Sequence, residues 1–281
     1  MTEFIDIEHH YLDYQGSKIH FVTCGNSSNP PLFLLHSFYM SWAIFRPYLP
    51  ALVQRFFIVV PDFPGFGDSM MLVSVNDTKG YCLVLNGIRK FIKAEKISLF
   101  GFSAGGVVAL KYASLYPENV YRLCEQGAPY FHKDYKIIMR DRLILWASVW
   151  PAIPKFLQWL ARWHFIWPIL RRVSKNLDNE LKVLEKGRLE ADVAQIKVRA
   201  GHEWGRDILN VDLRRDLPNI KCPTLILACG RDPYLTVDSI KRMVGYFSIS
   251  PVLDVASGAD HELTLKNIEY TTSKIISFCS P

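Results

Sequence analysis

The sequence lacks the features that mark several large classes of protein. No uninterrupted apolar run approaches the about 18 residues of a membrane-spanning helix. No Gly-x-Gly-x-x-Gly turn and no phosphate-binding loop suggests a nucleotide cofactor. The residues before position 11 are acidic and amphipathic, not basic and then apolar, so we expect no secretory signal and a cytoplasmic protein.

Cysteine pairs of the kind that bind metal are also missing. None of the six cysteines forms a Cys-x-x-Cys pair or has a histidine at a spacing that suits zinc. Most lie within apolar runs, which predicts reduced, buried thiols and no disulfide framework. We therefore expect no metal and no cofactor. The cysteines are Cys24, Cys82, Cys124, Cys222, Cys229 and Cys279.

Length and charge point to one enlarged domain with an unusual segment. A chain of 281 residues fits one α/β domain that carries an insertion. The net charge is +6, but residues 131–175 alone hold nine Lys or Arg and two Asp, so the rest of the chain is close to neutral. The same segment holds five of the seven tryptophans. This segment therefore differs from the rest of the chain in both charge and tryptophan content.

Short apolar runs predict a mostly parallel sheet. Two of them flank a Gln-Gly-Ser turn and are typical of an antiparallel hairpin. Six more alternate with helical patterns, which favours a doubly wound, eight-stranded sheet covered on both faces, with a ligand site beyond the carboxyl ends of the strands. The expected strands are 11–14, 18–22, 31–35, 56–60, 97–100, 121–124, 224–229 and 252–255.

The alternation of strands and helices is interrupted once. About eighty residues after the sixth strand have a helical pattern, with prolines dividing it into several helices. Both ends of this insertion rejoin the sheet at consecutive strands, so we expect it to lie over the carboxyl edge as a cap. The predicted division is a core of residues 1–128 and 211–281 and a helical cap, or lid, of residues 129–210.

A serine lies where a strand is expected to turn sharply into a helix. The segment Gly101-Phe102-Ser103-Ala104-Gly105 follows an apolar run and precedes a helical stretch of small residues. Glycines two positions to either side of the serine let a tight turn form, and the following helix directs backbone N–H groups toward the serine oxygen. A glycine-rich loop can match this pattern by chance, but the flanking strand and helix favour a nucleophile.

The chain resembles the α/β-hydrolase fold superfamily, in its capped, esterase-like branch. The resemblance covers residues 11–128 and 211–278 and is weak over the cap. It implies an eight-stranded sheet with the cap inserted after the sixth strand. The segments that carry it are His36-Ser37-Phe38, the loop 62–69 with Asp-Phe-Pro-Gly-Phe-Gly-Asp-Ser, the serine turn, the segment 222–232 that ends in Gly-Arg-Asp, and Gly258-Ala259-Asp260-His261.

Two further residues complete a catalytic triad by this resemblance. A serine hydroxyl needs a base to take its proton, and His261 follows the final strand, where the superfamily places that base. Asp232 follows the strand 224–229, where the family places the carboxylate that orients the imidazole. Glu125, directly after the sixth strand, is a rival for the acid, and Asp260 is expected to point elsewhere.

Stabilising the oxyanion of an ester intermediate requires two N–H donors. One is expected from Ala104, next to the nucleophile, and the resemblance assigns the other to Phe38. Ser37 replaces the commoner glycine and would be strained at a positive φ. The loop 62–69 is interpreted as architecture. The expected substrate-binding residues are His36, Ser37, Phe102, Trp159 and Trp163.

The tryptophans of the cap permit three interpretations. Trp159, Trp163 and Trp167 recur at one-turn spacing and define one helix face, which can roof an acyl pocket. Tryptophan beside Lys and Arg also suits a membrane surface, so peripheral membrane contact stays open. No recognition motif accompanies the charge, and we expect no nucleic-acid partner.

Together these features predict a serine hydrolase that cleaves a carboxylic ester with a hydrophobic acyl or alcohol part through an acyl-enzyme. The expected partner is a small hydrophobic ester. Serine as nucleophile argues against the aspartate-dependent relatives that open epoxides. Two alternatives remain: a carbon–carbon bond hydrolase of a vinylogous diketone, and a small-ligand receptor without catalysis. The sequence does not predict the acyl-chain length of the substrate or the oligomeric state of the protein.

Overall fold

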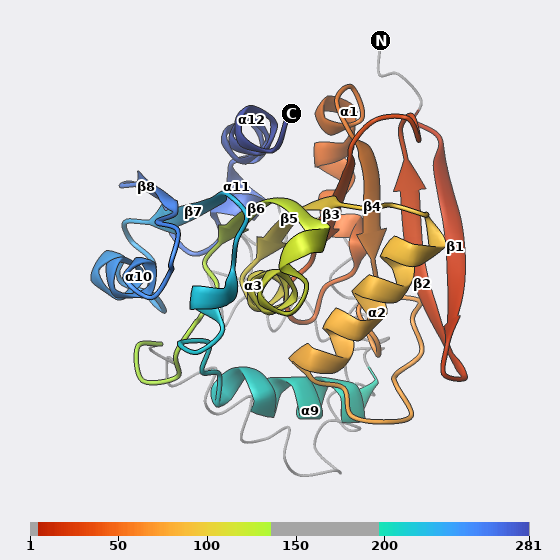
Figure 1. The fold of residues 1–281 in the computed structure, drawn as a ribbon, viewed down its shortest axis with the longest axis horizontal. Helices are drawn as coiled ribbons and strands as arrows, with labels where there is room; N and C mark the ends of the chain where they lie inside the picture. The colour runs from red at the N-terminus through yellow and green to blue at the C-terminus, as the bar shows by residue number, and fades with distance from the viewer. Residues whose placement is uncertain (1–4, 136–196, 281) are drawn as a thin grey trace, which may run out of the picture.

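The computed structural model describes residues 5–135 and 197–280. Its centre is an eight-stranded sheet in the order β1-β2-β4-β3-β5-β6-β7-β8 (Figure 1). The pairs β1–β2 and β2–β4 are antiparallel and all later pairs are parallel, which confirms the predicted mostly parallel sheet. The strands are β1 Ile7–Tyr14, β2 Ser17–Cys24, β3 Pro31–Leu35, β4 Phe57–Pro61, β5 Ile97–Phe102, β6 Val120–Gln126, β7 Thr224–Cys229 and β8 Val252–Ala256.

The hairpin of β1 and β2 closes through a two-residue turn. Gln15 and Gly16 both have positive φ, 52° and 81°, as a tight turn matched to the twist of the strands requires. The register pairs Tyr14 with Ser17 and Ile7 with Cys24, so the two strands pair over their full length. The predicted hairpin is confirmed, and its two strands are longer than the apolar runs 11–14 and 18–22 that predicted them.

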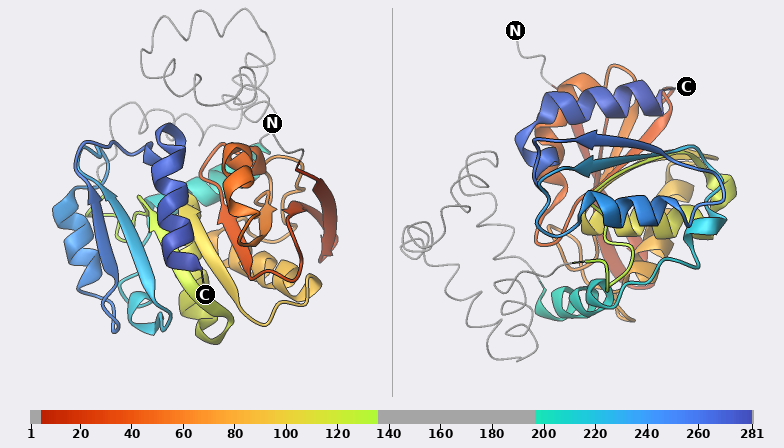
Figure 2. Two further views of the ribbon diagram at one scale, coloured as in Figure 1. Left: turned by 90° about the horizontal axis from the view of Figure 1, so that it is seen from above. Right: turned by 90° about the vertical axis from the view of Figure 1, so that its left-hand side faces the viewer.

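Helices cover both faces of the sheet, as the two views in Figure 2 show for α12 on one side and α3 and α10 on the other. Alternate residues of the central strand β3 enter two separate cores: Phe33 and Leu35 pack with α2 and α3, while Leu32 and Leu34 pack with α12. The helices are α1 Leu49–Leu52, α2 Thr78–Phe91, α3 Ala104–Leu115, α9 Val198–Leu209, α10 Val237–Val244, α11 Leu263–Lys266 and α12 Ile268–Cys279, with short 3₁₀ helices at Trp42–Tyr48, Pro117–Asn119 and Leu217–Asn219.

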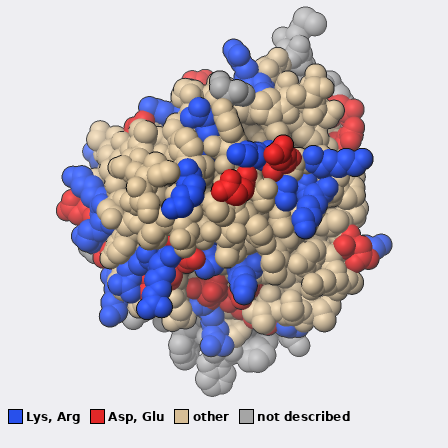
Figure 3. Space-filling view, viewed as in Figure 1, with Lys and Arg blue, Asp and Glu red and all other residues tan. Residues whose placement is uncertain are grey.

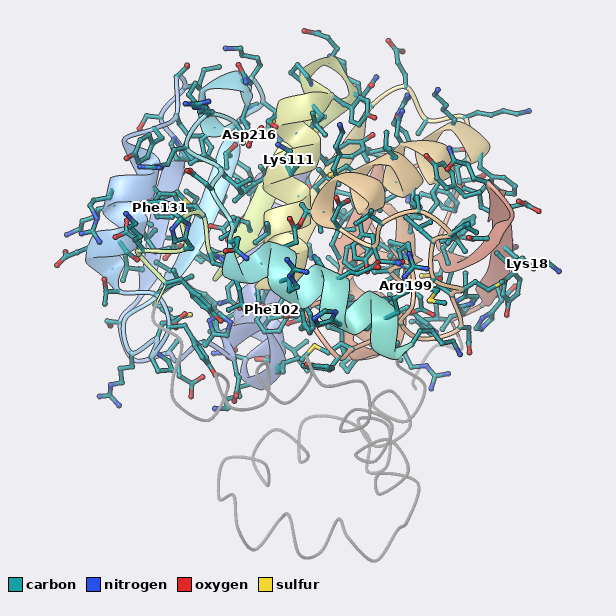
Figure 4. All side chains as sticks on the ribbon, turned by 90° about the horizontal axis from the view of Figure 1, so that it is seen from below. Lys18, Phe102, Lys111, Phe131, Arg199 and Asp216 are labelled. Carbon is teal, nitrogen blue, oxygen red and sulfur yellow. The ribbon has the colours of Figure 1, made fainter. Side chains whose placement is uncertain are left out.

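The last helix of the predicted cap, α9, is fixed to the core. Glu203 accepts hydrogen bonds from the backbone and side chain of Asn76, and Asp207 accepts one from the Thr78 N–H at 2.9 Å. Arg199, near the start of α9 (Figure 4), donates to the carbonyl of Ser74 at 2.6 Å. Residues 136–196 lie outside the described residues, so the limits of the cap stay a prediction.

Two composition-based expectations can be compared with the structure. All six cysteines are free and buried, as predicted, and burial raises the pKa of the Cys24 and Cys229 thiols to about 12. Within the described part of the chain, no helix is both long enough and apolar enough to cross a bilayer. On the face drawn in Figure 3, basic and acidic side chains lie intermixed, as expected of a nearly neutral core.

Candidate active site

Ser103 lies at the top of a sharp turn between β5 and α3. Its backbone has φ 53° and ψ −116°, a left-handed conformation that an L-residue rarely adopts. A side chain at Gly101 would place its Cβ 2.6 Å from the Cα of Gly106, and one at Gly105 would overlap the carbonyl oxygen of Leu35. Both glycines of the motif are therefore required by close backbone approach, as the sequence predicts.

The strain at Ser103 leads to a stability prediction. Backbone held in this region costs about 1 to 3 kcal/mol, which glycine avoids. Glycine also gains backbone entropy on unfolding, worth about 0.5 to 1 kcal/mol. We expect Ser103→Gly to unfold in urea with a free energy about 1 kcal/mol higher than Ser103→Ala, which lacks the same hydroxyl but keeps the strain. Equal stability of the two variants would contradict a strained turn.

A hydrogen-bonded chain joins the three predicted triad residues. His261 Nε2 lies 2.9 Å from Ser103 Oγ, and His261 Nδ1 lies 2.7 Å from Asp232 Oδ2. The Asp232 side chain is 2% exposed, and its other oxygen accepts the N–H groups of Tyr234 and Leu235. Asp232 therefore both shapes a turn and faces the imidazole.

The rival acids have other partners. Glu125 is fully buried; its Oε2 accepts the Ala128 N–H at 2.9 Å, and its Oε1 has no hydrogen-bond partner. Burial, with a smaller contribution from the nearby charge of Asp232, raises the pKa of Glu125 to about 8. Asp260 pairs with Lys266 at 2.6 Å. Among the described carboxylates, Asp232 is the one hydrogen-bonded to the His261 ring.

Glu125 should make stability depend on pH. Its pKa is about 8 in the folded protein against 4.5 for the free side chain, so between these values the folded state holds a proton that the unfolded state has lost. The contribution of Glu125 to the free energy of unfolding is fully present below pH 4.5. It is lost as the pH rises toward 8, by about 1.4 kcal/mol per pH unit. We expect Glu125→Gln to gain stability over wild type as pH rises from 5 to 8 in urea unfolding. A difference that stays constant with pH would contradict this.

The loop after β3 lies against the start of α3. As the first residue of α3, Ala104 has an N–H with no acceptor inside the helix, directly beside Ser103. The Cβ of a residue at position 105 would lie 2.5 Å from the carbonyl oxygen of His36, which shows how closely loop and helix approach. Ser37 does not have a positive φ; Tyr39 does, at 59°. The condition under which Ser37 would be strained is therefore not met, and the positive φ in this loop falls two residues later.

The expected substrate-binding residues that the structure describes are all buried. His36 has no exposed surface; its Nδ1 is 2.8 Å from the Ser37 carbonyl and its Nε2 accepts the Phe63 N–H. Burial lowers the pKa of His36, in keeping with a neutral ring that joins two loops instead of touching a substrate. Ser37 and Phe102 are also buried, and the Phe102 ring centroid lies 5.8 Å from that of His261. Trp159 and Trp163 lie outside the described residues.

Three residues beside the site were not anticipated from the sequence. Trp204 of α9 is fully buried and stacks on Phe38, with ring centroids 4.7 Å apart. Tyr234 contacts His261 edge to face at 4.9 Å. Gln126, at the end of β6, hydrogen-bonds around the triad. Tyr234 could have been expected beside the site, because it lies two positions after Asp232 in the sequence. Trp204 and Gln126 reach the site only through tertiary packing.

The loop 62–69 has the architectural contacts that its sequence predicts. Asp62 is fully buried, lies 2.7 Å from His20 Nδ1, and accepts the N–H groups of Trp42 and Asp68. A Cβ at Gly67 would overlap the Asp62 carboxylate. The glycine therefore lets the loop close over the buried Asp62 side chain, which ties together β2, the loop and the segment after β3.

A parallel sheet with a strained serine at its carboxyl edge, next to an imidazole and a carboxylate, defines a protein of the hydrolase class. The chain belongs to the alpha/beta hydrolase family, whose family model matches residues 32–269. This match confirms the superfamily to which the sequence motifs point.

Individual relatives have modest sequence identity to this chain, 32% and 28% for the two described next. A soluble epoxide hydrolase of Corynebacterium sp. (strain C12) is 32% identical over 108 residues, which cover 38% of this chain and 37% of that protein. A pimeloyl-(acyl-carrier protein) methyl ester esterase of Aeromonas hydrophila is 28% identical over 240 residues, 82% of this chain and 89% of that one. The match covers less than half of the length of some curated relatives: 37% of the Corynebacterium enzyme, and 44% and 42% of two others.

Solved structures agree on the fold. The enol-lactonase from Burkholderia xenovorans LB400 superposes with a TM-score of 0.76 over 96% of this chain and 99% of that one, at 16% sequence identity. The esterase from Exiguobacterium antarcticum gives 0.75 over 96% and 98%, at 20% identity. At these identities the likeness establishes the architecture and not the substrate.

Proposed function

We propose that this α/β hydrolase cleaves carboxylic esters, with Ser103 as nucleophile, His261 as general base and Asp232 as the acid that orients the imidazole. The proposal rests on one observation, the hydrogen-bonded chain from Asp232 through His261 to Ser103, with distances of 2.7 and 2.9 Å. Such contacts are what proton transfer from a serine requires.

The reaction proceeds in two halves. Ser103 Oγ attacks the ester carbonyl while His261 Nε2 takes its proton, and the tetrahedral intermediate collapses as His261 gives that proton to the departing alcohol. Water, deprotonated by His261, then attacks the acyl-serine and releases the carboxylic acid and the free serine. We assign the N–H groups of Ala104 and Phe38 to the oxyanion, at about 3 to 4 kcal/mol of barrier for each donor.

The chemistry of the nucleophile distinguishes ester cleavage from epoxide opening. Attack of a carboxylate on an epoxide gives an ester, which water can cleave at its carbonyl. Attack of a serine hydroxyl would give an ether, which has no carbonyl and would end turnover. Because Ser103 occupies the strand-to-helix turn, we do not carry the activity named for the Corynebacterium relative over to this chain.

The surroundings favour an apolar substrate. The rings of Phe102 and Tyr234 lie beside His261, and Phe38 carries its ring against Trp204. We therefore propose an ester with a hydrophobic acyl or alcohol part. The roles of Trp159 and Trp163 as a roof, and membrane contact through residues 131–175, remain predictions that belong to the cap.

A substrate panel tests the proposal. We expect p-nitrophenyl esters of graded chain length to be hydrolysed with kcat/KM about 100-fold or more above a vinylogous diketone or styrene oxide, a difference of about 2.7 kcal/mol in barrier. Faster cleavage of the diketone would favour the carbon–carbon hydrolase. Tight binding of a hydrophobic ligand, with no turnover and no covalent labelling by a fluorophosphonate, would favour a receptor.

A further inference from the structure

Gln126 lies among the strands that carry the candidate triad. It is the last residue of β6, its side chain is fully buried, and β6 is hydrogen-bonded to β5 on one side and β7 on the other. Ser103 follows β5 and Asp232 follows β7. Among the described strands, β6 alone is paired with both β5 and β7, so its carboxyl end lies between the segments of Ser103 and Asp232.

Hydrogen bonds from this single residue reach all three segments of the site. Its carbonyl oxygen accepts the Ser103 N–H at 2.7 Å. Its side-chain Nε2 donates to the His261 carbonyl at 3.1 Å and to the sulfur of Cys229, the last residue of β7, at 3.6 Å. Its Oε1 accepts the Thr264 hydroxyl at 2.8 Å.

The neighbouring residue places the backbone against the imidazole. Gly127 has φ 71°, and a Cβ there would lie 2.9 Å from His261 Cε1. The chain thus turns away immediately after Gln126 and leaves room for the His261 ring. On its other side, Thr264 belongs to α11, which begins two residues after His261. The backbone at His261 is therefore joined to the end of β6 directly, and the start of α11 is joined to the same Gln126 side chain through Thr264.

We propose that Gln126 is a positioning residue that holds the loop of His261 at hydrogen-bonding distance from Ser103. The inference rests on the proposed function. Removing the amide would leave the His261 carbonyl without this donor and the buried Thr264 hydroxyl without its acceptor, which favours a displaced loop. A displacement of about 1 Å between reacting groups can lower a rate about 100-fold.

The test is Gln126→Met, which keeps the length and volume of the side chain and removes its amide. With p-nitrophenyl butyrate we expect kcat to fall by about 10- to 100-fold, while KM changes by less than about threefold. Thr224→Val is the matched control, because it removes a buried hydroxyl whose hydrogen bonds are to Cys222, at the opposite end of β7. It should retain wild-type kcat.

Two further readouts separate positioning from general destabilisation. The downfield proton NMR signal of the His261–Asp232 hydrogen bond should shift or broaden in Gln126→Met and not in Thr224→Val. Fluorophosphonate labelling of Ser103 should slow by the same factor as kcat. If wild type is not labelled, the proposed function fails; if wild type and Gln126→Met are labelled equally fast, the present inference is overturned.

A second variant keeps the test decisive if Gln126→Met does not fold. Thr264→Val removes the hydroxyl that donates to Gln126 Oε1 at 2.8 Å, and leaves in place Gln126 and the longer bond from the Thr264 N–H at 3.4 Å. We expect a decrease in kcat of about three- to tenfold, in line with the loss of one buried hydrogen bond. Thr264→Ser, which restores the hydroxyl, should recover wild-type kcat. Full activity of Thr264→Val would also contradict the role given to Gln126.

Discussion

Ser103→Ala is expected to lower kcat for p-nitrophenyl butyrate by on the order of 10⁴- to 10⁶-fold, because it removes the atom that forms the acyl-enzyme. The hydroxyl faces His261 at 2.9 Å. Its loss leaves the oxyanion donors and the apolar surroundings in place, so KM should change little. Circular dichroism and the unfolding midpoint would show that the sheet is retained.

A second serine on the same strand is a matched control. Ser98 is 1% exposed and lies five positions before the nucleophile, near the start of β5. Ser98→Ala makes the same chemical change away from the carboxyl edge and should keep kcat within about threefold of wild type. Substantial turnover by Ser103→Ala would contradict the assignment, since no other described serine is hydrogen-bonded to His261.

Asp232→Asn is expected to lower kcat by on the order of 10³- to 10⁴-fold. The Oδ1 that accepts the Tyr234 and Leu235 N–H groups can remain an oxygen, so the turn should keep its shape. The amide NH₂ would then face His261 Nδ1 and favour the tautomer with its proton on Nε2. That tautomer cannot accept the proton of Ser103. The measurement is kcat for p-nitrophenyl butyrate.

Two neighbouring acids provide the comparison. Asp260 is adjacent to His261 but pairs with Lys266, and Glu125 is buried without a bond to the imidazole. Asp260→Asn and Glu125→Gln should each retain kcat within about threefold of wild type. A loss in Glu125→Gln as large as that in Asp232→Asn would transfer the role of triad acid to Glu125.

The elements that local sequence determines were predicted well. Strands that are buried on both faces of a parallel sheet are continuous apolar runs. The runs at Pro31–Leu35 and Thr224–Cys229 therefore predicted strands directly. The turn at Ser103 was recognisable because only glycine fits at positions 101 and 105. The resemblance to the family added Asp232 and His261, which lie far apart in the chain and come together only through the sheet.

Contacts made by tertiary packing were not predictable in the same way. Trp204 falls in a segment assigned to the cap, yet α9 brings it onto Phe38. His36 has a polar ring and follows a strand at the catalytic edge, but two backbone partners occupy its nitrogens. Gln126 has no motif, because its importance depends on which strands lie beside β6. Such roles depend on neighbours that one sequence does not specify.

The measurement that tests the central claim most directly is mass spectrometry of the protein quenched during turnover of p-nitrophenyl butyrate. The account predicts a single butyryl adduct on the peptide that contains Ser103, present in wild type, accumulating in proportion to the initial release of nitrophenol, and absent from Ser103→Ala. Steady ester hydrolysis with no adduct at Ser103, or with the adduct on another residue, would contradict it.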